Sequence, residues 1–148
     1  MIRITAAQLS VGPSDPDRAG ARQVRIDYDL QVPPSDPAIG HELTERLVLV
    51  AVDRHDTPVR PRTDPVATAD GRFVVTGDTH RHIERNVARA SLDVGADWWT
   101  TDDGGGTVPI AEWPDHLVAR VELFLGDQLL AEASTPVVTG SWGALGPD

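Results

Sequence analysis

The sequence predicts an all-β protein built as an antiparallel sandwich of two sheets. Apolar residues recur at every second position from Gln23 to Val32, and again on both sides of Gly126-Asp127 within the stretch Leu117 to Val138. Leu43 to Asp53 is instead a nearly continuous apolar run of strand length. Period two places alternate side chains on one face of a strand, whereas a continuous run is typical of a strand covered on both faces.

The first part of the chain is expected to form two strands. Ile2 to Val11 alternates with one slip of phase, which predicts a strand with a bulge. Gln23 to Val32 has one apolar face and one charged face, so one face should join the core. Its apolar face comprises Val24, Ile26, Tyr28, Leu30 and Val32. Prolines between Val32 and Ala38 then end this strand, because proline has no N–H to donate to a ladder.

The middle of the chain leaves two interpretations open. Leu43 to Asp53 should be a central strand, followed by a proline-rich loop over His55 to Asp70 and a short strand over Gly71 to Thr76. The segment from Thr79 to Val94 fits a strand by its alternation and a short helix (79–94) by its apolar stripe and flanking cap residues. We favour the strand, because the surrounding elements are all β and a lone helix needs a face to cover.

Leu117 to Val138 is expected to be a β-hairpin that turns at Gly126-Asp127. We prefer a three-residue loop from Gly126 to Gln128, because a two-residue loop would set Val121 opposite Glu132. The longer loop sets Glu122 opposite Glu132 on the outer side, which is its cost. It pairs apolar residues across the hairpin: Leu125 with Leu129, Leu123 with Ala131 and Val121 with Ala133.

About seven strands at these spacings, with turn signals between them, predict an immunoglobulin-like antiparallel β-sandwich. We expect a single domain over residues 1–148, in which 139–148 form a C-terminal tail. The cysteine pair of antibody domains is missing, and the tryptophans fall in predicted loops. The resemblance is therefore to a fold class and carries over no functional residues.

The composition argues against several classes of function. The formal net charge is -10 and every basic residue is an arginine outside any basic run, so nucleic-acid binding would work against the protein's own field. The absence of cysteine excludes disulfide and thiol chemistry. No segment approaches the ~18 apolar residues of a membrane span, and the N-terminus lacks the apolar core of a secretory signal. We therefore expect no membrane contact and a cytoplasmic location.

The tryptophans are the main candidates for a binding surface. Trp98 and Trp99 are adjacent, so an extended backbone points them to opposite sides and leaves one exposed or covered by a partner. Together with Trp113 and Trp142 they are expected to form a protein interface or a stacking platform for a sugar. The alternative is that all four pack at the ends of the sandwich.

Three arginines are expected to form a basic stripe. Arg81, Arg85 and Arg89 share one face whether their segment is a strand or a helix. Asp27 and Asp29 of a second copy would complement this stripe, which predicts self-association through opposite charges. A plain solvent-facing surface is the alternative.

A calcium site is one further hypothesis. Asp97, Asp102 and Asp103 offer oxygen ligands in a glycine-rich loop. The alternating ligands and closing glutamate of an EF-hand are absent, so a solvated loop is the simpler interpretation.

A zinc site is the other metal hypothesis. His80 and His82 would project from the same face of a strand, with a further ligand among His41, His55 and His116. No HExxH motif is present, and nearby arginines would oppose a cation, so surface histidines are the simpler interpretation. No cofactor is expected.

The sequence contains no recognisable catalytic motif, with no GxSxG and no cysteine nucleophile. It predicts a non-catalytic interaction or structural module, acting as a subunit of a larger assembly or as a homo-oligomer. One alternative is a sandwich that binds a carbohydrate or small ligand through its tryptophans, with or without calcium. The other is a zinc-dependent hydrolase.

Overall fold

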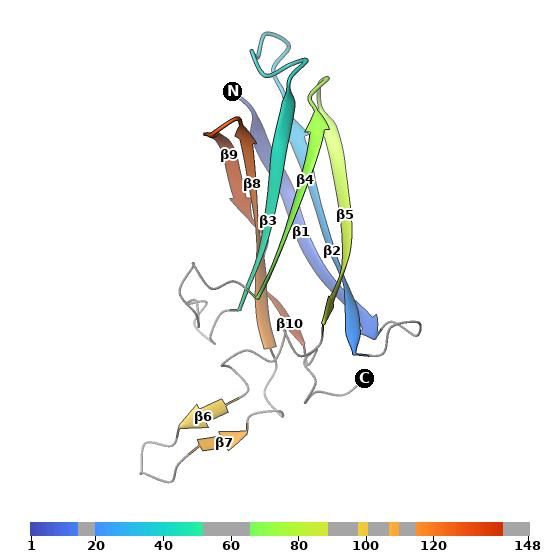
Figure 1. Ribbon diagram of the computed structural model, residues 1–148, viewed down its shortest axis with the longest axis vertical. Helices are drawn as coiled ribbons and strands as arrows, with labels where there is room; N and C mark the ends of the chain where they lie inside the picture. The colour runs from blue at the N-terminus through green and yellow to red at the C-terminus, as the bar shows by residue number, and fades with distance from the viewer. Residues whose placement is uncertain (15–19, 52–65, 89–97, 101–106, 110–114, 141–148) are drawn as a thin grey trace.

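The computed structural model describes residues 1–14, 20–51, 66–88, 98–100, 107–109 and 115–140. Within these ranges every regular element is a β-strand, and eight of the strands form two antiparallel sheets that face each other (Figure 1). The predicted immunoglobulin-like antiparallel β-sandwich is therefore confirmed. None of the described segments is a helix with the length and hydropathy needed to cross a membrane.

The first sheet has the strand order β1-β2-β5. Its strands are β1 (Arg3–Ser14), β2 (Ala21–Gln31) and β5 (Thr79–Ala88). The bulge predicted in β1 lies between Thr5 and Gln8, where Ala6 adopts a φ of 53°. A bulge adds unpaired residues to one strand. Leu9 consequently returns to the buried face opposite Ile26.

The second sheet has the order β10-β8-β3-β4, and β9 also pairs with β8. Its strands are β3 (Glu42–Ala51), β4 (Ala67–Val74), β8 (Asp115–Leu125), β9 (Gln128–Ser134) and β10 (Val138–Gly140). β3 lies between β8 and β4, and both its inward Leu47 and Leu49 and its outward Val48 and Val50 are buried. The prediction of a central strand covered on both faces is therefore confirmed.

The β8–β9 hairpin has a shorter loop than the sequence predicted. Gly126-Asp127 alone forms the loop, so Leu125 lies opposite Gln128 and not opposite Leu129. The φ of 60° at the glycine suits the first loop position of a type II′ turn, whose twist matches that of the flanking strands. A register shift then absorbs one extra residue of β9. The following pairs are those predicted: Leu123–Ala131, Glu122–Glu132 and Val121–Ala133.

The edge of β8 is covered by two short strands separated by a break. β9 ends at Ser134, and β10 (Val138–Gly140) continues along the same strand. In the break, buried Thr135 donates its N–H to the Ala119 carbonyl at 2.9 Å, and its Oγ1 accepts the Ala119 N–H at 3.0 Å. The first two residues expected in the C-terminal tail therefore belong to a strand. Residues 141–148 lie outside the described ranges.

Three other segments can be compared with the sequence prediction. The favoured strand is present over Thr79–Ala88, while residues 89–94 are not among those described. β4 begins at Ala67, so the end of the expected proline-rich loop is already strand. β6 (Trp98–Thr100) pairs with β7 (Thr107–Pro109) in a two-stranded ribbon, where the sequence suggested only loop.

The core lies between the inward faces of the two sheets. β2 buries every second residue, as its alternation predicted. Facing it are apolar side chains of the second sheet: Leu43, Leu47 and Leu49 from β3, and Leu117, Ala119, Val121 and Leu123 from β8. Glu45 and Arg81 are among the charged residues that occupy positions on these same inward faces.

Candidate functional site

The structure places the predicted interface residues in different settings. Trp98 and Trp99 belong to β6, where the backbone alone is described. Arg81 and Arg85 belong to β5 and share its inward-facing side, opposite Tyr28 and Val24 of β2. The remaining candidates lie outside the described residues: Trp113, Trp142, Arg89, Asp97, Asp102 and Asp103.

Arg81 is held inside its own chain instead of forming the predicted surface stripe. Its Nε donates to Oε2 of Glu45 and its Nη2 donates to Oε1, both at 3.1 Å. Glu45 belongs to β3 of the other sheet and is 2% exposed, so this bidentate ion pair crosses the core. Arg85, four residues along, is exposed, and its Nη1 donates to the Glu84 carbonyl at 2.8 Å.

Tyr28 completes this buried cluster. It is fully buried opposite Arg81 on β2, and its hydroxyl donates a hydrogen bond to Oε2 of Glu45. A buried carboxylate is tolerated only when it is paired and hydrogen-bonded. Two donors at Oε2 and one at Oε1 meet that requirement. We call Tyr28, Glu45 and Arg81 the inter-sheet cluster.

β4 supplies space and cover for the inter-sheet cluster. Gly71 lies opposite Glu45, and a Cβ at this position would lie 3.2 Å from Glu45 Oε1. Phe73, two residues on, places its ring centroid 4.4 Å from the Arg81 Cζ, which is a cation–π contact. The glycine thus leaves room for the carboxylate, and the phenylalanine shields the cation from solvent.

The inter-sheet cluster holds its protons tightly. Burial, and then the hydrogen bond to Glu45, raises the pKa of Tyr28 far above its ordinary value of 10.0. The hydrogen bonds to Glu45 also raise the pKa of Arg81. Tyr28 therefore remains a neutral donor and Arg81 a cation at neutral pH. Their arrangement suits a connection between sheets better than proton transfer.

Neither Glu45 nor Tyr28 was predicted from the sequence to belong to a polar cluster. The signal that could have revealed the cluster is that Glu45 and Arg81 stand at alternate positions shared with apolar core residues. Glu45 occupies the inward side of β3 between Leu43 and Leu47, and Arg81 shares the inward side of β5 with Ile83. Opposite charges at core positions of two strands indicate a buried ion pair.

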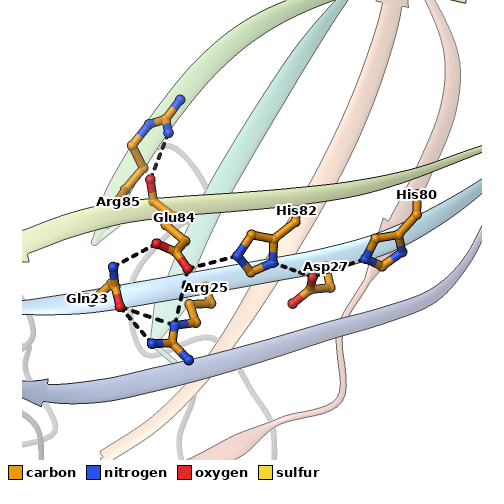
Figure 2. A network of polar contacts seen from close by, with 7 residues as sticks. All are labelled: Gln23, Arg25, Asp27, His80, His82, Glu84 and Arg85. Atoms are coloured by element: carbon orange, nitrogen blue, oxygen red, sulfur yellow. Dashed lines mark hydrogen bonds and ion pairs between the residues drawn. The ribbon is translucent and has the colours of Figure 1, made fainter.

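A second polar cluster covers the outer face of β2 and β5 (Figure 2). His80 and His82 project from one face of β5, as predicted, and lie opposite Asp29 and Asp27. His80 Nδ1 lies 2.8 Å from Asp29 Oδ1, and His82 Nδ1 lies 2.5 Å from Asp27 Oδ1. Glu84 Oε1 lies 2.8 Å from His82 Nε2. We call these five residues the imidazole–carboxylate cluster.

This cluster changes two expectations from the sequence. Asp27 and Asp29 contact histidines of their own chain, whereas the sequence suggested that they pair with arginines of a second copy. Among the described residues, no group of three or more histidine or carboxylate side chains is placed to hold a metal ion. The zinc hypothesis for His80 and His82 thus finds no support in the geometry, and His55 lies outside the described part.

A hydroxyl and an imidazole meet on the second sheet. Thr139 Oγ1 lies 3.1 Å from His116 Nδ1 on adjacent strands. An activated nucleophile needs its base to be oriented by a third group. Among the described residues, Thr139 alone contacts the His116 ring by a hydrogen bond or ion pair, so no third group orients this imidazole there.

A cleft of about 420 Å³ opens between β4 and β5, the neighbouring edges of the two sheets. Apolar side chains including Leu47, Leu49 and Ile83 line it, and Asp70 and Arg85 add charge. Small-molecule sites are typically apolar clefts of ~300–1,000 Å³ with a few polar groups. Its size and lining therefore suit a small, mainly apolar ligand.

The comparisons with known proteins give a likeness of fold. No protein-family model and no curated protein matches the sequence. A glycosyl hydrolase family 2 member from Bacteroides cellulosilyticus DSM 14838 matches 93% of this chain with a TM-score of 0.55 and 10% identity. A second crystal structure of such a member from Bacteroides cellulosilyticus matches 93% at a TM-score of 0.54 and 10% identity.

The match is confined to a small part of those proteins. This chain corresponds to 15% and 14% of the two Bacteroides chains. A β-glucuronidase from glycoside hydrolase family 2 is similar over 90% of this chain, at 10% identity and a lower TM-score of 0.48. At 10% identity the likeness shows the fold alone. This chain shares that fold with a β-domain of the longer chains.

Replacing Glu45 by glutamine should destabilise the protein by about 2–3 kcal/mol, because Arg81 loses its counter-charge in the core. The loss should be below the ~3–5 kcal/mol of a fully buried pair, since the Arg81 side chain is 27% exposed. Urea denaturation measures it. Glu42→Gln is the matched control on β3, because its 3.8 Å pair with Arg72 is exposed and worth ~0–1 kcal/mol. Equal effects of the two substitutions would contradict the role of the cluster.

Tyr28, the single tyrosine of the chain, should stay protonated above pH 10.0 until the protein unfolds. Because its pKa is higher in the folded state, its stabilising contribution is complete below pH 10.0 and is lost as the pH rises further. Ultraviolet difference spectra detect the phenolate, and denaturation at several alkaline pH values measures the loss. Tyr28→Phe should remove this part of the pH dependence. A phenolate signal near pH 10.0 from folded protein would refute the prediction.

Proposed function

We propose that this chain is a non-catalytic β-sandwich module that makes contacts within a larger assembly or a homo-oligomer. The observation that carries the proposal is the extent of the fold match: the sandwich corresponds to 15% and 14% of two much longer glycosyl hydrolase family 2 chains. A segment that makes up about one seventh of a much longer enzyme fits a supporting module better than a complete catalytic domain. The inter-sheet cluster and the imidazole–carboxylate cluster are consistent with a non-catalytic role, because their charged groups pair with one another.

The contact surface in this proposal is the one suggested by the tryptophans. Trp98 begins β6, and Trp99 follows it in the same strand. Large aromatic side chains contribute strongly to interfaces because they bury much area at low entropy cost. Three of the charges that the sequence assigned to self-association are engaged within the chain, since Arg81 pairs with Glu45 and Asp27 and Asp29 contact histidines. Apolar contact, and not charge, should therefore drive association.

The experiment is light scattering behind a sizing column at low and high salt. We expect an oligomer whose mass does not fall with salt, and a monomer after the double substitution Trp98→Ala, Trp99→Ala, with the melting temperature unchanged. Val74→Ser is the matched control, because it removes a 52% exposed apolar side chain from β4. An unchanged mass of the tryptophan variant would contradict the proposed surface, and a salt-sensitive mass would point back to charge.

The β4–β5 cleft favours a second candidate, a module that binds a small ligand or sugar. A ligand that binds only the folded state raises the melting temperature. We expect a thermal-shift screen of sugars and small amphipathic molecules to give a positive compound. Ala69→Phe, which fills the cleft from β4, should abolish the shift, whereas Val74→Phe on the outward side of β4 should keep it. A shift that survives Ala69→Phe would place the ligand elsewhere.

A further inference from the structure

His80 and His82 each contact carboxylates through both ring nitrogens. Figure 2 shows the contacts with Asp27 and Glu84. For His80, Nδ1 lies 2.8 Å from Asp29 Oδ1 and Nε2 lies 3.3 Å from Asp27 Oδ1. For His82, Nδ1 lies 2.5 Å from the same Asp27 oxygen and Nε2 lies 2.8 Å from Glu84 Oε1. Asp27 thus lies between the two rings, and the other two carboxylates end the row.

This arrangement fits the protonated form of both rings. A neutral imidazole has one N–H donor and one lone pair. With a carboxylate at each nitrogen, a neutral ring would direct its lone pair at a carboxylate oxygen. An imidazolium donates from both nitrogens and satisfies both contacts. All four contacts are therefore favourable only when His80 and His82 each carry a proton.

The groups around the rings set the local charge. Arg25 of β2 contacts Glu84 Oε1 at 3.5 Å. Asp78, next to β5, accepts the Val32 N–H at 2.7 Å. On the far side of β2, the facing residues of β1 are neutral: Thr5, Gln8 and Ser10. The three carboxylates of the cluster thus face three cations when both rings are protonated, and Arg25 alone when both are neutral.

The contacts cross the pairing between β2 and β5 at directly opposite positions. His80 lies opposite Asp29, and His82 lies opposite Asp27. Within the described ranges β5 is an edge strand that pairs with β2 alone. Opposite charges on facing residues stabilise an antiparallel pair, and repulsive contacts there weaken it. The state of the two rings therefore acts on the attachment of an edge strand.

We propose that His80 and His82 form a proton-operated latch that fastens the edge strand β5 to β2. With both rings protonated, all four contacts between the imidazoles and the carboxylates are attractive. Loss of the protons turns two of the contacts repulsive, and β5 opens more easily. β5 also lines the β4–β5 cleft and carries Arg81. Opening of β5 would therefore expose the cleft and the inter-sheet cluster to solvent.

The direction of the pH response follows from the same contacts. The hydrogen bond with Asp29 raises the pKa of His80 above its ordinary value of 6.5. Hydrogen bonds first with Glu84 and then with Asp27 raise the pKa of His82. The folded protein therefore binds these protons more tightly than the unfolded chain. The stabilisation is complete below pH 6.5 and is lost as the pH rises through the raised values.

A histidine NMR titration of three variants tests the contacts. Asp29→Asn should lower the pKa of His80 selectively, Glu84→Gln should lower that of His82, and Asp27→Asn should lower both. His116 is the internal reference, because its ring contacts the Thr139 hydroxyl instead of this cluster, and its signal should not respond. If His80 and His82 titrate at the ordinary value and ignore the substitutions, the proposal is overturned.

Amide hydrogen exchange tests the latch itself. Protection of β5 amides, corrected for intrinsic exchange, should fall as the pH rises through the histidine titration, while protection of β8 amides stays constant. Asp27→Asn should remove most of this pH dependence, and the neutral side chain keeps the size of the original. Protection of β5 that does not change with pH, or that changes equally in β5 and β8, would overturn a local latch.

Discussion

The carboxylate of Glu45 lies between the two sheets, and much of the sandwich is arranged to make that position tolerable. Removing a charge from water costs several kcal/mol unless partners replace the lost solvation. Those partners come from the opposite sheet, through Tyr28 and Arg81, while Gly71 leaves the space. A slip of one residue in β5 would turn Arg81 outward and leave the carboxylate without its counter-charge. The cluster therefore disfavours incorrect registers of β5 strongly.

β5 joins two different electrostatic environments through its alternating side chains. Arg81 points inward to a shielded ion pair, whereas His80 and His82 point outward to carboxylates in contact with water. An exposed sheet edge tends to pair with other chains, and charged side chains suppress such pairing. This chain contains no lysine, so arginine, histidine and glutamate serve that purpose on β5. Charge on this strand thus fixes its register and protects the edge along which no described strand pairs.

The sequence predicted the sandwich because burial of one face leaves a period-two pattern, which is clear in β2 and β8. It failed at the hairpin loop, since a three-residue loop and a two-residue loop followed by a bulge lead to the same apolar pairs beyond it. The role of Arg81 was missed because periodicity within a strand assigns a face but not a partner. Glu45 lies 36 residues away in the chain and in another sheet, so only packing brings the two together.

The lack of a side chain at Gly71 matters for residues on four strands, β2, β3, β4 and β5. A Cβ there would lie 3.2 Å from Oε1 of Glu45, so the carboxylate would have to shift by a few tenths of an ångström against the partners that hold it. Without that carboxylate, the buried hydroxyl of Tyr28 and the cation of Arg81 would lose their acceptor. We therefore expect single substitutions at these four positions to destabilise the protein more than combined ones. Proteins descended from the same ancestor should keep all four residues together or replace them as a set, leaving a covariation signature that no individual strand carries.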